Sequence, residues 1–172
     1  QATRLMLAVR PHPDQGRDWS AIMGRQSTHG ICGLCGARKT KGAMRDHLRN
    51  CAADHDAPKG DKSRLFHIRV HGRHDPVFWV DLEVKRDAKL RALDDFLRRL
   101  WLECCGHLSS FHIDGVTYAV VVDREFGFGR DERSMNCRIG DVLHGPGHRF
   151  GYEYDFGSTT ELALQVWGWR DG

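Results

Sequence analysis

Apolar residues occupy every second position over residues 66–70 and again over residues 78–84. This alternation is the pattern of two strands that each bury one face. The connector between them contains Gly72, Asp75 and Pro76, residue types that are common in turns. We therefore expect an antiparallel hairpin whose core-facing residues are Phe66, Ile68, Val70, Phe78, Val80, Leu82 and Val84.

The spacing of apolar residues changes to three and four after this hairpin and predicts the main helix, over residues 88–104. Asp87 is a typical N-cap residue, and Gly106 stands where a helix C-cap is expected. The helix would cover one face of the sheet with a single apolar stripe, formed by Leu90, Leu93, Phe96, Leu97, Leu100, Trp101 and Cys104.

After this helix, the chain adds mainly strands. The pair Asp114-Gly115 predicts a second tight hairpin. We expect an exposed loop over the charged residues 124–136 and a short helical turn over residues 139–144. With about six strands in all, the pattern predicts an α+β fold, a mostly antiparallel sheet with one main amphipathic helix on one face. The further strands are expected at residues 111–113, 116–122, 150–154 and 162–166.

Composition excludes two classes of protein. The 172 residues include five Trp, eight Phe and three Tyr, enough large apolar side chains to exclude wholesale disorder. No run approaches the roughly 18 apolar residues of a membrane span. Without a secretory cleavage pattern at the start, we expect a soluble, cytoplasmic protein with no membrane partner.

The most specific chemistry lies in four residues of the N-terminal part, Cys32, Cys35, His47 and Cys51. A Cys-x-x-Cys turn followed by His and Cys four residues apart has the spacing of a zinc finger whose last His is replaced by Cys. If residues 41–50 are helical, His47 and Cys51 project from the same face. Four protein ligands leave no open coordination position, so we predict a structural Zn²⁺.

Metal would also explain how this small part of the chain folds, because it has few apolar residues. Met44 and Leu48 lie beside the ligands in sequence and would form its small core. We expect a basic N-terminal segment over residues 1–62 that contains the finger at about residues 28–55. A solvated linker over residues 50–63 would lead into an α+β domain over residues 63–172.

Charge divides the chain in the same place. Residues 1–64 carry 12 Lys and Arg against 6 Asp and Glu, whereas residues 65–172 carry 14 against 17. A basic finger could hold a phosphate backbone, so DNA or RNA is one possible partner. Fingers also dock proteins, so the alternative is a protein-interaction adaptor that binds its partner through the zinc module and a sheet edge. The residues expected to contact nucleic acid are Arg38, Lys39, Lys41, Arg45 and Arg49.

The remaining reactive residues favour structural roles. Cys105 and His107 could form a nucleophile and its base, but Cys104 continues the apolar helix stripe and no orienting acid is evident nearby in sequence. His107, His112 and Cys137 could in principle bind a second metal, although such residues are more often surface groups. We assign no catalytic residue. We expect Tyr152, Tyr154, Trp167 and Trp169 to pack in the core rather than stack bases, and His67, His71 and His74 to face solvent.

Two stretches of the second part resemble a known family. They are Leu100-Trp-Leu-Glu-Cys-Cys-Gly-His-Leu-Ser109 and Tyr152-Glu-Tyr-Asp-Phe-Gly-Ser-Thr-Thr-Glu-Leu162. Residues 65–169 are similar to the plasmid pRiA4b ORF-3-like family, whose members are often labelled passenger proteins of insertion elements. The resemblance implies a small α+β domain and a mobile-element context, with no established activity. Many relatives continue this run as Gly-Asp-x-Trp-x-His. This chain has Ser158, Thr160 and Leu162 in place of the Asp, Trp and His, so if those family residues form a polar site, this chain lacks it.

Overall fold

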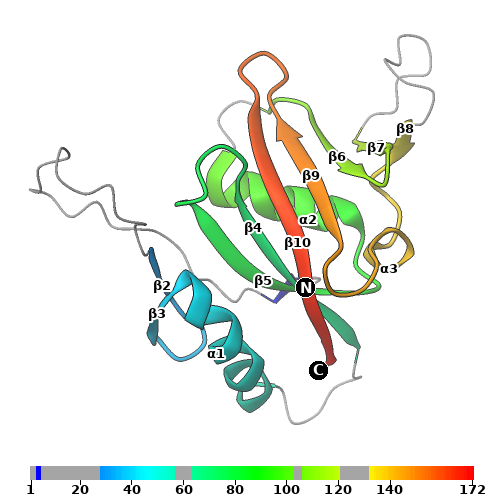
Figure 1. Cartoon of the computed structure of the whole chain (residues 1–172). Coiled ribbons are helices and arrows are strands. Elements are labelled where there is room, and N and C mark those ends of the chain that lie inside the picture. The colour runs from blue at the N-terminus through cyan, green and yellow to red at the C-terminus, as the bar shows by residue number, and fades with distance from the viewer. Residues whose placement is uncertain (1–2, 5–27, 57–62, 103–105, 121–131) are drawn as a thin grey trace, which may run out of the picture.

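The computed structural model describes residues 3–4, 28–56, 63–102, 106–120 and 132–172. Within these residues, eight strands form one sheet in the order β1-β5-β4-β10-β9-β6-β7-β8 (Figure 1). All neighbours pair antiparallel except β7 and β8. The predicted α+β class is confirmed. The strands of this sheet are β1 (Thr3–Arg4), β4 (Arg64–Gly72), β5 (Trp79–Lys85), β6 (Ser109–Ile113), β7 (Val116–Ala119), β8 (Glu132–Ser134), β9 (Arg149–Tyr154) and β10 (Thr160–Asp171).

The hairpin predicted from alternation is present, but its outer face is not in solvent. Phe66 pairs with Val84 and Val70 pairs with Val80, as the pattern requires. The prediction was wrong for Phe78, which lies before β5 and is 52% exposed. The six residues from Trp79 to Val84 are all buried. Because neighbouring residues of a strand point to opposite faces, both faces of β5 must be covered.

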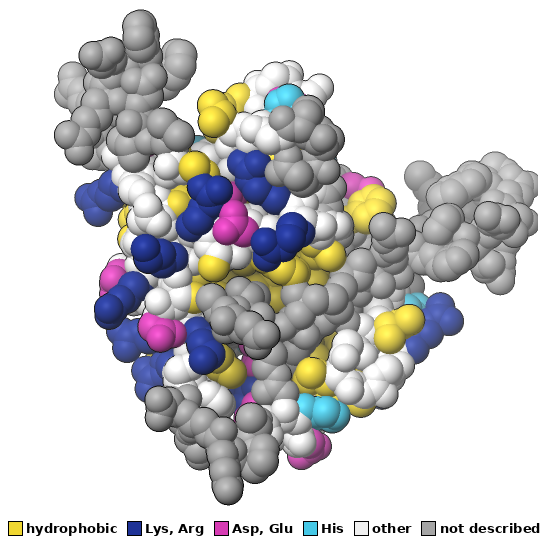
Figure 2. Space-filling model, turned by 180° about the vertical axis from the view of Figure 1, so that it is seen from behind, with side chains coloured by type: hydrophobic (Ala, Val, Ile, Leu, Met, Phe, Trp, Pro, Cys, Tyr) yellow, Lys and Arg dark blue, Asp and Glu magenta, His cyan; other side chains and the backbone are white. Residues whose placement is uncertain are grey.

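One face of the sheet packs against α2 (Leu90–Leu97) and carries the main core. There the apolar residues of β4 and β5 pack against the apolar face of α2. The short helix α3 (Ile139–Val142) contributes to the same core. Figure 2 shows the molecule from the α2 side, where Lys and Arg side chains are spread with a few acidic ones between them. The fully buried residues of this core include Ile68, Leu82, Leu90, Leu93, Leu97, Phe111, Ile113, Ile139 and Val166.

The start of α2 differs from the sequence prediction. Lys89, not Asp87, is the N-cap residue, and it makes no side-chain cap. The free N–H groups of the first turn donate instead to backbone carbonyls, from Leu90 to Cys137 and from Arg91 to Met135. These bonds satisfy the N–H groups that a side-chain cap would otherwise accept. The helix therefore begins where residues 135–137 pass beside it.

The end of α2 also departs from a regular helix. Residues Arg98–Leu102 form a π-helical turn, so the predicted α-helix to Cys104 is too long. Cys104 and Cys105 lie outside the described residues. Gly106 has a φ of +79°, the left-handed conformation expected for a glycine after a helix.

The Asp114-Gly115 hairpin is confirmed as the connection of β6 and β7. Asp114 and Gly115 both have positive φ, at 50° and 79°, which is the geometry of a tight hairpin turn. The predicted loop over residues 124–136 is wrong in its last part, since Glu132–Ser134 is β8 and Met135 is buried. Residues 121–131 lie outside the described part of the chain.

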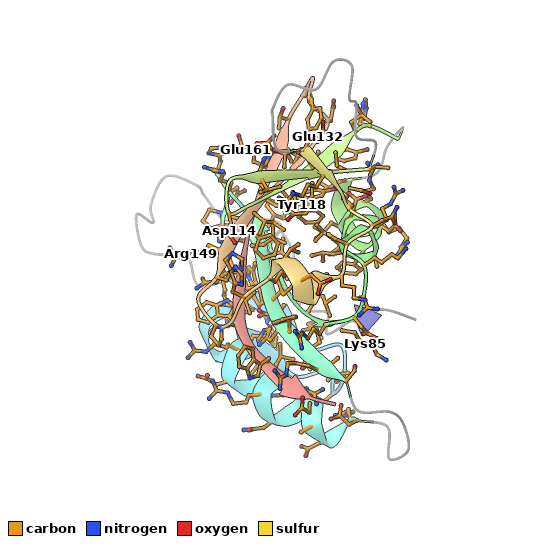
Figure 3. All side chains as sticks on the ribbon, turned by 90° about the vertical axis from the view of Figure 1, so that its right-hand side faces the viewer. Lys85, Asp114, Tyr118, Glu132, Arg149 and Glu161 are labelled. Atoms are coloured by element: carbon orange, nitrogen blue, oxygen red, sulfur yellow. The ribbon has the colours of Figure 1, made fainter. Side chains whose placement is uncertain are left out.

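The opposite face of the sheet is covered by the N-terminal part. A hairpin of β2 (His29–Ile31) and β3 (Arg38–Thr40) leads into α1 (Lys41–Asp54). In Figure 3, α1 and α2 lie on opposite sides of the sheet. The helix predicted over residues 41–50 is confirmed and continues to Asp54, so residues 50–54 are not the linker that was expected; residues 57–62 are not described. No helix in the described residues is long and apolar enough to span a membrane.

Candidate metal centre

The turn between β2 and β3 presents the first two cysteines. The backbone N–H of Cys32 donates to the carbonyl of Ala37, and that of Gly36 donates to the carbonyl of Cys32. Gly36 has a φ of +75°, which a residue with a side chain adopts only at a cost. These bonds close a tight knuckle that places Cys32 and Cys35 on the same side of the hairpin.

The other two ligand-type residues come from one face of α1. His47 and Cys51 are four residues apart and therefore lie one above the other on the helix. The Thr40 hydroxyl caps the helix by accepting the backbone N–H of Ala43 at 3.2 Å. The cap fixes where the helix starts and so sets the rotation at which the two residues face the knuckle.

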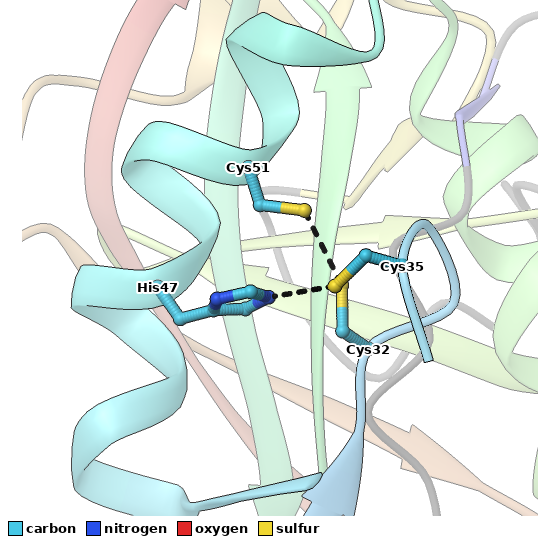
Figure 4. Close-up of side chains that lie close together, drawn as sticks. All are labelled: Cys32, Cys35, His47 and Cys51. Carbon is cyan, nitrogen blue, oxygen red and sulfur yellow. Dashed lines mark hydrogen bonds between the residues drawn. The ribbon is translucent and has the colours of Figure 1, made fainter. Parts of the chain in front are cut away.

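The four predicted residues meet at one point (Figure 4). Their ligand atoms all lie within 4.8 Å of one another. The Sγ atoms of Cys32 and Cys51 are 3.9 Å apart, and Cys35 Sγ lies 3.3 Å from Nε2 of His47. A tetrahedron with metal–sulfur bonds of about 2.3 Å has edges of about 3.8 Å. The spacing of the donor atoms therefore fits a tetrahedral metal ion, and this cluster could bind one.

Burial disfavours thiolates at the cluster unless a cation is bound. Cys32 and Cys51 are buried, with 1% and 7% of their surface exposed, whereas Cys35 is exposed. Burial raises the pKa of Cys51 to about 12, with contributions from the other two cysteines. At Cys35 the pKa is lowered, first by a backbone hydrogen bond at Ala37. A bound cation would favour the thiolate at all three positions.

A small apolar core surrounds the cluster and includes one residue from the sheet. Met44 and Leu48 are buried, as predicted, and Ala52 packs with them. Trp79 of β5 completes this core, and its Nε1 donates to the Thr28 hydroxyl at 2.8 Å. The N-terminal part therefore shares its core with the sheet.

A buried ion pair fastens the start of α1 to the same strands. Arg69 of β4 donates from Nε and Nη2 to the two carboxylate oxygens of Asp81 in β5, at 3.0 and 2.7 Å. Its Nη2 also donates to the Lys41 carbonyl at 2.7 Å. His67 donates to Asp81 at 3.0 Å with 14% of its side chain exposed, so the prediction that it faces solvent was wrong. Asp81 thus neutralises the cation that holds α1.

A second arginine fastens the end of α1. Arg170 near the end of β10 donates to both oxygens of Glu83, at 2.6 and 2.7 Å, and to Asp56 just after the helix, at 2.9 Å. Glu83 is buried, so the arginine provides its counter-charge. The sequence did not predict these contacts, because the charged residues at alternate positions of β5 are typical of a strand face exposed to solvent.

The five basic residues expected to contact nucleic acid are not equivalent. Arg38 and Arg49 are exposed, and Lys39 is partly exposed. Lys41 donates from Nζ to the Pro76 carbonyl at 2.8 Å, and burial lowers its pKa. Arg45 lies 5.0 Å from the ring of Trp167 and pairs with Asp46. Two of the five side chains therefore make contacts within the molecule.

Within the described ranges, the other candidate residues are not gathered into a site. His107 pairs with Asp155 at 3.4 Å, and His112 pairs with Glu153 at 3.2 Å. Among the described residues, neither forms a ligand cluster with Cys137. Cys104 and Cys105, the other half of the nucleophile hypothesis, are not described. Tyr152 and Tyr154 are buried, which confirms their place in the core, whereas Trp169 is 51% exposed.

Comparisons with known proteins match the part of the chain that forms most of the sheet. The model of a family described as plasmid pRiA4b ORF-3-like protein matches residues 63–171. A solved structure of a protein of unknown function from Methanosarcina mazei Go1 has a TM-score of 0.55 and 14% sequence identity. That match covers 66% of this chain and 65% of that chain, slightly under two thirds of its length, and it shows a shared fold alone. No curated protein matches the chain in sequence.

Proposed function

The chain belongs to the plasmid pRiA4b ORF-3-like family, and we propose that it is a zinc-binding, non-enzymatic accessory protein of mobile-element type that associates with nucleic acid. The observation that supports the proposal best is the meeting of Cys32, Cys35, His47 and Cys51 within 4.8 Å. Residues from about 28 to 55 would form the zinc finger, and the family domain would hold it in place.

Zinc suits this set of donors better than other common ions. Three thiolates and one imidazole are soft or borderline ligands, and tetrahedral sites of this composition typically hold Zn²⁺. Four protein donors leave no position for water or substrate, so the ion would be structural. Its role would be to fold the finger against the sheet.

The finger would meet its partner through the basic side chains that stay available. Arg38 and Lys39 lie on β3, and Arg49 lies on the third turn of α1. Lys41 and Arg45 would instead position the helix, through Pro76 and Trp167. Phosphate contacts are made mostly by Arg and Lys and add salt dependence without sequence preference.

Binding of a labelled DNA duplex and an RNA hairpin, measured by fluorescence anisotropy between 50 and 300 mM salt, tests this proposal. Changing Arg38, Lys39 or Arg49 to Glu should weaken binding several-fold and reduce the salt slope by about 1 for each lost phosphate contact. Arg133→Glu is the matched control, because Arg133 is exposed on β8, the strand at the opposite end of the sheet from β1. Equal effects of all four changes, or binding that does not depend on salt, would contradict the proposal.

A protein partner is the second candidate, and the outer face of α1 favours it. In a ββα finger, the residue before the helix and its third and sixth residues reach the bases. Here those residues are Thr40, Ala43 and Asp46, and none is a long cationic side chain. If wild-type protein fails to bind either nucleic acid, a protein captured by crosslinking and lost in the Cys32→Ser, Cys35→Ser double variant would support the adaptor role.

A further inference from the structure

A second group of metal-ligand side chains comes together where the turn between β6 and β7 meets the loop between α3 and β9. Asp114 (labelled in Figure 3) lies in the turn between β6 and β7. His144 and His148 flank the loop Gly145-Pro146-Gly147, which connects α3 to β9. The ligand atoms of the three residues lie within 4.8 Å of one another. Asp114 and His144 are thirty residues apart in sequence, so no short sequence motif predicts the cluster.

The two imidazoles share the one carboxylate. Nε2 of His144 lies 3.1 Å from Oδ2 of Asp114, and Nε2 of His148 lies 3.1 Å from Oδ1. The two rings are 4.7 Å apart between centroids. In the part of the chain that the structure describes, no Lys or Arg pairs with this carboxylate. The negative charge at the centre of the cluster is therefore held by neutral or titratable groups alone.

Both backbone segments that carry the cluster are fixed by hydrogen bonds. Gly147 donates to the Val166 carbonyl at 2.8 Å, and Val166 donates to the His148 carbonyl at 2.9 Å, which ties the loop to β10. On the other side, Asp114 sits in the tight turn that its positive φ defines. A site carried by rigid segments loses little conformational entropy when it binds an ion.

We propose that Asp114, His144 and His148 bind a divalent first-row transition-metal ion at a site distinct from the cysteine cluster. Two imidazoles and one carboxylate are a donor set that such ions accept, with the remaining coordination positions open. Asp114 is 53% exposed and His144 is 70% exposed, so these positions face solvent. An ion there could carry water or a small anion, which the four-ligand finger cannot do.

The hydrogen bonds of His148 must change when the ion binds. The backbone N–H of His144 donates to Nδ1 of His148 at 2.9 Å, so the ring proton of neutral His148 is on Nε2. Coordination through Nε2 moves this proton to Nδ1 and breaks the contact with the backbone N–H. The ring stays neutral, and two hydrogen bonds of His148, to the backbone and to Asp114, are exchanged for one metal bond. We therefore expect weaker binding than at the cysteine cluster.

Cobalt(II) distinguishes the two sites, because thiolate-to-cobalt charge transfer in the near ultraviolet requires sulfur ligands. Full-length protein is treated with chelator, loaded with one equivalent of Zn²⁺ and titrated with CoCl₂. The expected result is one further equivalent of cobalt with visible ligand-field bands and no charge-transfer band. Appearance of the charge-transfer band would show that some cobalt had bound to the cysteine cluster in place of zinc. Cobalt bound beyond the amount that this band accounts for would then report the second site.

Substitutions then assign the cobalt to the three residues. Asp114→Asn keeps a residue that tolerates positive φ and removes the charged ligand, and His144→Ala removes an exposed ring. Each should weaken cobalt binding at least tenfold, whereas His74→Ala, at a histidine 79% exposed on the β4–β5 turn, should leave it unchanged. No uptake of cobalt by the zinc-loaded wild-type chain, or uptake that survives both cluster substitutions, would overturn the proposal.

Discussion

At the scale of single residues, Asp94 shows how a charge is kept inside the core. This carboxylate of α2 is fully buried and accepts hydrogen bonds from Ser109, at 2.7 Å, from Tyr152, at 2.8 Å, and from Arg98, at 3.1 Å. Burial and the neighbouring Asp94 raise the pKa of Tyr152 far above its usual value, so the hydroxyl stays a donor. Ser109 and Tyr152 belong to the two stretches that carry the family resemblance, which gives both stretches a structural role.

Asp94→Asn should lower the free energy of unfolding by about 3 kcal/mol, because it removes the buried negative charge that pairs with Arg98. Asp95→Asn is the matched control, since Asp95 lies next to it, is 41% exposed and pairs only with Arg91 among the described ion pairs. The control should change stability by less than about 0.5 kcal/mol. Urea denaturation measures both changes, and equal effects would contradict the role given to Asp94.

Asp81 predicts a loss of stability in acid. Burial alone would raise its pKa, but the hydrogen bonds from His67 and Arg69 outweigh burial, and the pKa lies below its ordinary value. A carboxyl whose pKa is lower in the folded protein stabilises it fully above the unfolded pKa of about 3.9. This contribution is lost as pH falls through the folded pKa.

The measurement compares wild type with Asp81→Asn by urea denaturation from pH 7 to pH 3. The difference in stability should be constant above about pH 5 and shrink below about pH 4. Because both proteins would lose metal in acid alike, the comparison isolates the carboxyl. A difference that stays constant down to pH 3 would contradict the assignment.

Single residues also show what sequence could and could not reveal. The four cysteine-cluster residues were predicted because their spacing is local, within one turn and one helix. Trp79, Arg69 and Asp81 were not, because alternation assigns their positions to the outer face of a strand and cannot say that another element covers it. The two histidines of the Asp114 cluster lie 30 and 34 residues after Asp114, and only the fold brings the three residues together.

At the scale of elements, the start of α1 controls the geometry of the cysteine cluster. Thr40→Ala removes the hydroxyl that accepts the Ala43 N–H and should destabilise the helix by about 1 kcal/mol. If metal binding and folding of the finger are coupled, affinity for zinc should fall about fivefold. Competition with a chromophoric chelator measures the affinity. Thr40→Ser, which keeps the cap, should behave as wild type, and a loss as large in this control would contradict the explanation.

The elements that were predicted well are those with strong periodic patterns. The β4–β5 hairpin and the body of α2 follow from the local spacing of apolar residues, and the turn between β6 and β7 follows from the pair Asp114-Gly115. β8 was missed because Glu132–Ser134 has no apolar alternation and is held by backbone pairing with β7. The cap at Asp87 was predicted wrongly because carbonyls from residues 135 and 137, distant in sequence, take its role.

At the scale of the whole molecule, the N-terminal part is packed onto the sheet. Trp79 joins the small core around the cysteine cluster, while Arg69 and Arg170 bind the two ends of α1. These contacts explain why charged residues can be buried on β5, since each has an opposite charge within hydrogen-bonding distance. A metal ion bound by the cysteine cluster would thus stabilise one face of the family domain as well as the N-terminal part.

The most direct test of this account is the X-ray absorption fine structure at the zinc edge, recorded on full-length protein that carries one equivalent of zinc. The account predicts three sulfur atoms at about 2.3 Å and one nitrogen at about 2.0 Å. His47→Cys should convert the shell to four sulfur atoms. A zinc shell of nitrogen and oxygen alone in the wild-type protein would contradict the assignment of Cys32, Cys35, His47 and Cys51.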